Sequence, residues 1–470
     1  MVLKNILNAG ERALDAAKFA LEYGEASLNE TVIKLAVTGL SRSGKTVFIT
    51  SMIQNLLALG DQKNTLPELT KRLMQDGQTR LIDVKILAAG AEQIPRFDFK
   101  SKLALLESDK PEWPSPTDDL ATISLMMTLK RPDSGVNAAL KRLGQTDHRI
   151  KLEILDYPGE WLLDLPILSQ SYGDWARATL DLMRSEPRSQ AFEEFIRYTR
   201  ESITADGKPD EALMRKAHLL YKRGLTECRE KHGLQFLQPG RFVCPGPKGA
   251  DIPFLWFFPI DTEGRTPRAE TTAELLARRF ESYKEYVRRE FFDTYFAEFN
   301  RQILLVDVLT ALYKGRSIFK DTEMAIEEIA KGLATQKIAK LAVAATKADH
   351  VPPRSRDNLA SLAEDLTESA FRGRPNKNDI FHAIASIDST EPTVVTRGDR
   401  QVVAVTGKID GQMRPYDVGE VPSKMPESDY FDYQLFSLPG FEPRRFDPKI
   451  QYIKNIGIDK VLDTMVGDSL

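Results

Sequence analysis

The chain has few of the residues that build cross-links, metal clusters or membrane spans. Of its 470 residues only Cys228 and Cys244 are cysteine, and only five are histidine. Two cysteines do not make a disulfide framework or a zinc site, and five scattered histidines form no metal-ligating set. No apolar run approaches the ~18 residues that a membrane helix needs. These absences exclude a disulfide-stapled scaffold, a zinc module and a helical membrane protein.

An excess of charge of one sign is also lacking. The 65 Lys and Arg residues nearly balance the 68 Asp and Glu residues, which leaves a formal net charge of −3. Without a basic excess, extensive contact with nucleic acid is not expected. The N-terminus has no continuous apolar core followed by a cleavage site, so we expect no secretory signal and predict a cytoplasmic protein. The length predicts two or three domains with a large core.

What the sequence does contain is a glycine loop at residues 39–46, with the letters GLSRSGKT. Residues 32–37 before it read as a strand and residues 47–57 after it as a helix, which is the context of a phosphate-binding P-loop rather than of an ordinary glycine turn. Backbone N–H groups and the helix N-terminus would face the phosphates. Lys45 would reach the β- and γ-phosphates, and the Thr46 hydroxyl would ligate Mg²⁺.

A second candidate motif lies at the end of residues 149–155, where Leu152, Ile154 and Leu155 suggest a strand. This strand would carry Asp156 at its C-terminal end, where a carboxylate can hold Mg²⁺ opposite Thr46. Gly159 could present its N–H to a γ-phosphate, because no Cβ blocks the approach. A D-x-x-G turn is common by itself, so this prediction depends on the order of the motifs along the chain.

A third motif reads the base. The apolar run 340–345 leads into Thr346, Lys347 and, after one alanine, Asp349. A buried carboxylate at Asp349 could accept two hydrogen bonds from guanine N1 and N2, which adenine does not offer. The stem of Lys347 would lie over the base. The alternative is a solvated lysine beside an aspartate that caps a helix.

A proline-rich loop precedes the strand predicted at residues 121–129. A switch threonine that coordinates Mg²⁺ would sit in such a loop. Thr117 is the first choice and Thr122 the second, while a rigid proline turn explains the loop equally well.

Together the four motifs resemble the ordered G1 to G4 boxes of Ras-like and translation-factor-like GTPases. Their wording is similar to that of the bacterial YcjX-like P-loop NTPase family, over nearly the whole chain. The resemblance implies binding and hydrolysis of GTP, and a link to phage-shock or envelope-stress operons, hence a stress-linked switch. Expected metal ligands are Thr46, Thr117 and Asp156. Expected nucleotide contacts are Ser41, Arg42, Ser43, Gly44, Lys45, Thr46, Val47, Gly159, Thr346, Lys347, Asp349, Ala385 and Ser386.

Two positions depart from the usual GTPase pattern. Thr346 stands where Ras-like proteins usually have Asn, and its hydroxyl could tie this loop to the P-loop with fewer hydrogen bonds. Glu160 stands where many GTPases place a Gln or His that orients water. Its carboxylate could accept from the water, but its charge beside the γ-phosphate should slow hydrolysis. The expected catalytic residues are Lys45, Glu160 and Arg42, with slow turnover.

The predicted fold is α/β, a G-domain-type P-loop NTPase with a mostly parallel sheet. An amphipathic helix would occupy residues 1–30, and the GTPase domain would be split into residues 31–160, with extra structure at 61–115, and residues 301–392. A mainly helical insertion would fill residues 161–300, in which the apolar run 253–259 reads as a buried strand or as an exposed partner-binding patch. A β-rich appendage with a hairpin at 393–405 and a closing helix at 450–466 would complete residues 393–470.

Two other functions remain open at this point. The first is an ATPase, which keeps the P-loop and treats residues 346–349 as a coincidence. The second is a nucleotide-gated interaction protein with negligible turnover, which binds a protein partner through the insertion. Peripheral contact with a membrane surface through the N-terminal helix also stays open, although that helix has few cations on its polar face.

Overall fold

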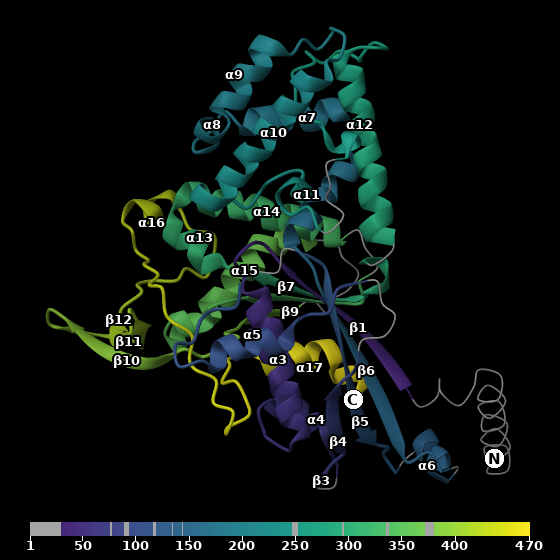
Figure 1. Ribbon diagram of the computed structural model, residues 1–470. Helices are drawn as coiled ribbons and strands as arrows, with labels where there is room; N and C mark the ends of the chain where they lie inside the picture. Colours follow the sequence, from purple (N-terminus) through teal and green to yellow (C-terminus); the bar gives the residue numbers. More distant parts are fainter. Residues whose placement is uncertain are drawn as a thin grey trace, which may run out of the picture.

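A computed structural model of the chain describes residues 30–75, 78–88, 94–115, 119–133, 135–142, 144–246, 252–293, 296–334, 338–371 and 380–470. The helix expected at the N-terminus and the expected metal ligand Thr117 lie outside the described residues. Figure 1 shows a sheet with helices around it and a tall group of further helices above. Within the described ranges, no helix is both long and apolar enough to cross a membrane.

A seven-stranded sheet organises the lower part of the molecule. In spatial order its strands are β4 (Leu81–Ile86), β5 (Ala121–Lys130), β6 (Asp147–Asp156), β1 (Glu30–Gly39), β7 (Arg301–Val306), β8 (Lys340–Ala345) and β9 (Ile380–Ala383). Strands β6, β1, β7, β8 and β9 run parallel, whereas β5 pairs antiparallel with both β6 and β4. This arrangement confirms the predicted α/β class with a mostly parallel sheet, and β1 lies at its centre.

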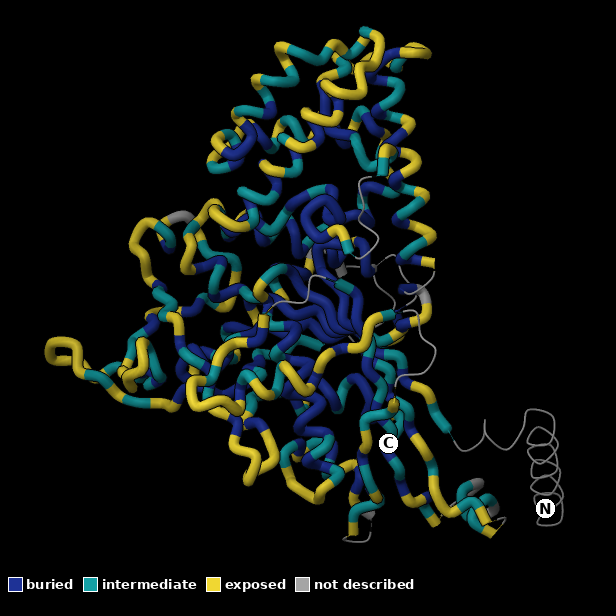
Figure 2. Tube along the Cα trace, viewed as in Figure 1, coloured by how far each residue is buried: buried dark blue, intermediate teal, exposed yellow. Residues whose placement is uncertain are grey.

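Helices cover both faces of this sheet. One face carries α3 (Lys45–Gly60), α4 (Pro67–Leu73), α5 (Phe99–Glu107) and α17 (Ile458–Val466), and the other carries α13 (Val308–Lys314), α14 (Arg316–Ala334) and α15 (Arg356–Phe371). On β7, Leu304 and Val306 pack toward α14, whereas Ile303 and Leu305 pack toward α3 and α17. Strands buried on both faces need continuous apolar runs, which explains the lack of polar alternation in β7 and β8. In Figure 2 these strands form the buried centre.

The insertion between β6 and β7 contains no strand among its described residues. Its helices are α7 (Tyr172–Leu182), α8 (Arg188–Ala191), α9 (Glu193–Ser202), α10 (Glu211–Glu227), α11 (Gly240–Val243) and α12 (Thr272–Val287), with short 3₁₀ turns at η1 (Gly159–Asp164), η2 (Pro166–Ser169), η4 (Pro253–Leu255) and η6 (Phe296–Glu298) and π turns at η3 (Cys228–His232) and η5 (Arg288–Asp293). Aromatic rings hold it together: Trp175 stacks on Phe280 with ring centroids 5.1 Å apart, and Phe242 lies 4.9 Å from Phe257.

The strand predicted over residues 253–259 is wrong. This run begins with the turn η4 and continues without regular structure, although Phe257 and Phe258 are fully buried. An extended strand would need a neighbouring strand for its backbone N–H and C=O groups, and helices surround this run instead. Phe257 and Phe258 are buried in an aromatic core as predicted, whereas residues 253–256 are exposed or partly exposed.

The C-terminal part begins with a three-stranded antiparallel sheet of β10 (Thr390–Arg397), β11 (Arg400–Ile409) and β12 (Gln412–Tyr416), followed by α16 (Ser428–Asp432). The predicted hairpin is confirmed, with Gly398 in the left-handed conformation at its turn. The closing helix begins at Ile458, eight residues later than predicted. The reason is tertiary: Ile456 pairs with the backbone of Ala385, and Gly457 then starts the helix with φ 72°. Smaller elements are β2 (Met74–Gln75), β3 (Gln78–Thr79) and α6 (Gly135–Arg142).

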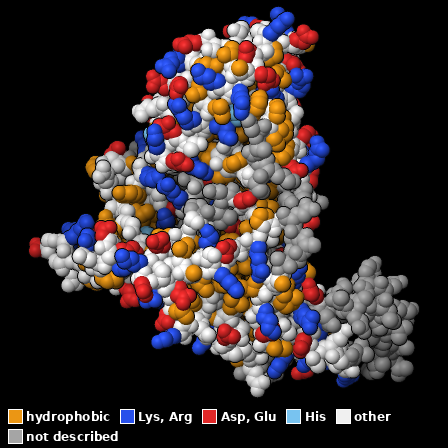
Figure 3. Space-filling view, in the orientation of Figure 1, with side chains coloured by type: hydrophobic (Ala, Val, Ile, Leu, Met, Phe, Trp, Pro, Cys, Tyr) orange, Lys and Arg blue, Asp and Glu red, His pale blue; other side chains and the backbone are white. Residues whose placement is uncertain are grey.

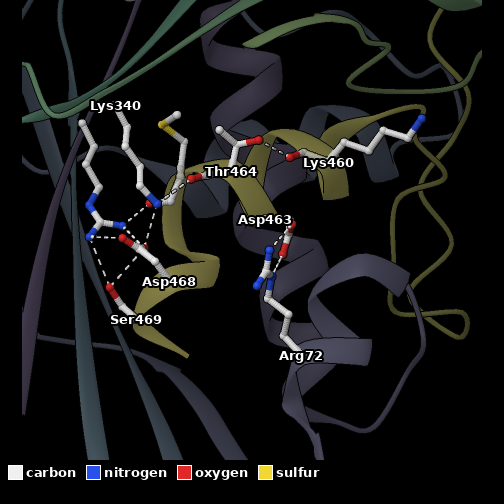
Figure 4. A network of polar contacts seen from close by, with 9 residues as sticks. Arg72, Lys340, Lys460, Asp463, Thr464, Asp468 and Ser469 are labelled. Carbon is white, nitrogen blue, oxygen red and sulfur yellow. Dashed lines mark hydrogen bonds and ion pairs between the residues drawn. The ribbon is translucent and has the colours of Figure 1, made fainter. Parts of the chain in front are cut away.

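Ion pairs attach the end of the chain to the sheet (Figure 4). Asp468 accepts from Arg301 at 2.7 Å and from Lys340 at 2.9 Å, and Asp463 of α17 pairs with Arg72 of α4. Partial burial by itself would raise the pKa of Asp468, but hydrogen bonds from Lys340 and Arg301 lower the pKa below its ordinary value. This carboxylate therefore stabilises the folded chain in its charged form.

We expect Asp468→Asn to destabilise the fold by about 1 kcal/mol or less, because the pair is partly exposed and screened. Since the folded pKa is lowered, the contribution is present above the unfolded pKa and disappears as pH falls through the folded pKa. Urea unfolding at pH 7 and in acid measures the difference between native chain and variant. Asp432→Asn on the exposed side of α16 is the control, and an equal loss in both variants would refute the role of Asp468.

Candidate functional site

The glycine loop joins the end of β1 to the start of α3. Gly44 is the residue before the helix and adopts φ 88°, a left-handed conformation that glycine takes without strain. The amide of Ser43 donates to the carbonyl oxygen of Leu40 at 3.1 Å, which closes the turn. The nearly buried Lys45 ammonium folds back across the loop and donates to the carbonyl oxygen of Gly39 at 2.7 Å. The loop therefore holds a cation and the N-terminus of α3 at one point.

Asp156 ends β6 beside this loop, and Gly159 follows three residues later and packs on it. In the parallel pairing of β1 with β6, Val37 stands opposite Asp156, so the carboxylate reaches the same sheet edge as the loop. A Cβ on Gly159 would lie 2.5 Å from both the carbonyl carbon and oxygen of Gly39 and 2.9 Å from the nitrogen of Leu40. The segment that follows β6 thus packs directly on the backbone of the P-loop.

The donors at this edge suit a magnesium ion. Thr46 supplies a hydroxyl and Asp156 a carboxylate, and both residues are buried. Oxygen ligands are those that Mg²⁺ prefers, and it keeps waters and phosphate oxygens for the rest of its shell. Within the described ranges no group of three His, Cys, Asp or Glu residues could hold a metal on its own.

Thr122, the second choice for the switch threonine, lies inside β5 and donates its amide to the carbonyl oxygen of Pro95 at 2.9 Å.

The segment predicted to contact the base, residues 346–349, follows β8 and is held by the end of β7. Lys347 adopts φ 64°, and its ammonium donates to Asp307 at 2.6 Å and to the Thr310 hydroxyl at 2.8 Å. Asp307 also caps α13 by accepting from the Thr310 amide at 3.0 Å. Burial by itself would raise the pKa of Asp307, but the Lys347 charge and these hydrogen bonds lower it. The ion pair anchors the Lys347 stem in the wall of the site.

The Thr346 hydroxyl does not tie this segment to the P-loop, so that expectation is wrong. The hydroxyl and the amide of Thr346 both donate to the carbonyl oxygen of Val306, at 3.3 and 2.9 Å. The strand order explains why the hydrogen bond goes elsewhere. Strand β7 lies between β1 and β8, so the carbonyl oxygen of Val306 at its end is closer to Thr346 than the P-loop is.

Asp349 is a buried carboxylate with 2% of its surface exposed. One of its oxygens accepts from the backbone amide of Ser389 at 3.1 Å, and the ring of His350 lies 4.0 Å away. Burial raises the pKa of Asp349, and burial likewise lowers the pKa of His350, which favours the neutral imidazole. A buried, ionised Asp349 is stable only if hydrogen-bond donors reach its oxygens. A base that carries such donors would therefore bind better than one that lacks them.

One cavity of about 560 Å³ connects the P-loop with this carboxylate, a volume typical of small-molecule sites. It brings together these sequence-predicted residues: Arg42, Ser43, Gly44, Lys45, Thr46, Val47, Thr346, Lys347, Asp349 and Ser386. Ser41 and Ala385 are not in its wall, and Ala385 instead pairs with Ile456. Asp156, Gly159 and the buried Glu160 are not in its wall either, and Arg42 is exposed with φ 64°.

Part of the cavity wall was not anticipated from the sequence. Residues 438–441 of the C-terminal part cover the end of the cavity beside Asp349, where the ring of Phe441 lies 5.0 Å from that of His350. The Trp113 indole donates to the carbonyl oxygen of Phe441 at 3.0 Å and joins this cover. Tyr313 and Lys314 of α13 complete the wall. The aromatic and proline content of residues 393–445 was visible, but no local pattern points it toward the P-loop.

The comparisons with known proteins agree with this geometry. A family model described as the YcjX-like family, DUF463, matches residues 33–470. A protein of Escherichia coli (strain K12) named "Ras-like GTPase YcjX" is 34% identical over 460 residues, which cover 93% of this chain and 96% of that protein. A protein of the same name from Shewanella oneidensis is 31% identical over 474 residues, covering 93% and 94% of the two chains.

Proposed function

The chain belongs to the YcjX-like family, and from this premise we propose that it is a GTPase-like protein that binds guanine nucleotides with Mg²⁺ and hydrolyses GTP slowly. The observation that carries the proposal is the shared cavity, with the P-loop at one end and the buried carboxylate of Asp349 at the other. The names of the two relatives agree with this proposal.

Each residue would perform a defined task. The amide of Gly44 would donate to phosphate oxygens, and Lys45 would exchange its bond to Gly39 for the phosphates. Asp349 would accept from the guanine, over which the anchored Lys347 stem would lie. Thr46 and Asp156 would hold Mg²⁺, which when bound neutralises phosphate charge.

Equilibrium competition on the native chain tests the base assignment. We expect GTP and GDP to displace a fluorescent GDP analogue at concentrations about a hundredfold lower than ATP, because ATP leaves the buried acceptor of Asp349 unpaired. Equal displacement by ATP would refute guanine selection and favour an ATPase.

Turnover depends on Glu160, a buried carboxylate in η1 directly after Gly159. Its charge would oppose a nucleophile and a γ-phosphate that are themselves negative, so we expect Glu160→Gln to raise phosphate release severalfold. Single-turnover phosphate release measures the change, with Glu263→Gln on the exposed insertion surface as the control. A fall in rate would instead identify Glu160 as the group that orients water.

If the native chain releases almost no phosphate and Glu160→Gln releases more, the result would favour a nucleotide-gated interaction protein over a hydrolase. The insertion, the largest addition to the sheet, would then be the partner-binding surface. In Figure 3 its visible face carries side chains of both charge signs. The role of a stress-linked switch, which the family resemblance implies, remains a prediction.

A further inference from the structure

The turn η1 (Gly159–Asp164) links the domain of the seven-stranded sheet to the insertion. At the start of the turn, Gly159 packs on the backbone of Gly39 in the P-loop. At its end, the carboxylate of the fully buried Asp164 accepts hydrogen bonds from the insertion through both oxygens. Six residues therefore separate a contact with the P-loop from an attachment to the insertion.

Asp164 attaches η1 to two helices of the insertion. One of its oxygens accepts from the amide of Gly240 at the start of α11, and the other accepts from the Tyr283 hydroxyl of α12, both at 2.7 Å. Burial raises the pKa of Asp164 to about 6, although these bonds and the charge of Arg241 act in the opposite direction. Above this pH the carboxylate is charged, and hydrogen bonds to a charged acceptor are stronger than those between neutral groups.

Further contacts attach the middle of the same turn to the insertion. The Trp161 indole donates to the carbonyl oxygen of Cys244 at 2.7 Å, and the guanidinium carbon of Arg241 lies 4.0 Å from the Trp161 ring centroid. The side-chain amide of Gln238 donates to the carbonyl oxygen of Leu163 at 2.7 Å. Because these bonds are buried or partly buried, η1 cannot shift without breaking them or moving the insertion with it.

The backbones of α11 and η1 also touch directly. A Cβ on Gly240 would lie 1.8 Å from the carbonyl oxygen of Glu160, so there is no room for either backbone to approach further. Figure 1 shows α11 at the base of the insertion and α12 along the height of the insertion. A displacement of η1 would therefore act on α11 first and reach the far end of the insertion through α12, because close-packed elements move together.

We propose that η1 couples the γ-phosphate site to the insertion, and that Asp164, Tyr283 and Gln238 are positioning residues for Gly159. This inference rests on the proposed GTP binding, with the Gly159 amide donating to the γ-phosphate as its motif predicts. The bonds from the insertion hold η1 against the P-loop, so little ordering remains when a γ-phosphate binds. By linkage, any ligand that shifts the insertion would change the affinity for GTP, and GTP would change the affinity for that ligand by the same factor.

The affinity for a non-hydrolysable GTP analogue relative to that for GDP tests the coupling, because only the analogue carries a γ-phosphate. Tyr283→Phe removes the hydroxyl that donates to Asp164. We expect it to weaken binding of the analogue about fivefold or more and to leave GDP binding within about twofold. Titration calorimetry on the full chain at about pH 8, where the Asp164 carboxylate is charged, measures both affinities. A merely structural role would weaken both nucleotides alike or lower only the unfolding temperature.

Tyr172→Phe is the matched control. Tyr172 is a buried tyrosine of α7 in the same aromatic core, and its hydroxyl donates to the carbonyl oxygen of Phe258 at 2.8 Å rather than to η1. This variant should leave the ratio of the two affinities unchanged. Gln238→Met removes the donor to Leu163 and should change the ratio in the same direction as Tyr283→Phe, so it provides the answer if Tyr283→Phe does not fold.

The outcomes separate this inference from the proposed function. If Tyr283→Phe and Gln238→Met both keep the native ratio, or if Tyr172→Phe changes it equally, the coupling is refuted while GTP binding stands. A native chain that binds neither the analogue nor GDP would refute the proposed function, and the coupling with it.

Discussion

Replacing Asp349 with asparagine is expected to shift the nucleotide preference from GTP toward XTP by about a hundredfold in the ratio of their affinities, equivalent to about 2.7 kcal/mol. The native carboxylate offers only acceptors, and guanine offers N–H donors at N1 and N2. Xanthine carries a carbonyl oxygen in place of the amino group at C2, so it matches the donor of an amide instead. Asp349 is 2% exposed, and water cannot easily compensate a mismatch there.

Competition of GTP and XTP for a bound fluorescent nucleotide measures this shift. Asp388→Asn is a matched control, because Asp388 is a nearby buried carboxylate that pairs with Lys454 and does not line the cavity. The native chain should also lose GTP affinity as pH is lowered, because burial raises the pKa of Asp349 and a protonated carboxyl accepts fewer hydrogen bonds. An unchanged GTP/XTP ratio in Asp349→Asn would refute the guanine assignment.

Substituting alanine for Gly159 should weaken GTP binding at least about tenfold and lower the unfolding temperature. The added methyl group would lie 2.5 Å from the carbonyl carbon and oxygen of Gly39, so the P-loop backbone would have to move. Overpacking of this kind typically costs about 1–3 kcal/mol, and here the strain falls on the loop proposed to hold the phosphates.

Gly173→Ala on α7 is the matched comparison, because its Cβ would meet its nearest atoms at 3.9 and 4.0 Å, in ordinary contact. Thermal unfolding and GTP titration of both variants separate local strain from a general effect of adding a methyl group. If Gly159→Ala resembles Gly173→Ala in both measurements, the packing of Gly159 on the P-loop is not important.

Local patterns were sufficient to predict the fold class. They also indicated which strand ends carry the residues expected to contact phosphate and base. The motifs stand at the ends of apolar runs, and the C-terminal ends of parallel strands meet at one edge of a sheet. The loop at residues 39–46, Asp156 and Asp349 therefore had to approach one another once the runs became β1, β6 and β8.

Other features depend on contacts between residues far apart in the chain, which no local pattern encodes. Trp113 bonds to Phe441 beside the Asp349 end of the cavity, and Thr346 bonds to the end of β7 because of the strand order. The apolar composition of residues 253–259 suits a buried strand as well as an aromatic core. The run is not a strand because its neighbours are helices, which offer no strand to pair with.

The sequence by itself determined the P-loop and the order of the motifs that follow it. It also determined the apolar segments between the motifs, which suit a parallel sheet. The tertiary structure alone decided that residues 438–441 cover the cavity beside Asp349, that Gly159 packs on Gly39, and that Arg241 stacks on Trp161. The physical reason is that periodicity and motif order act over short spans of chain. Close packing between distant segments is determined only by the folded whole.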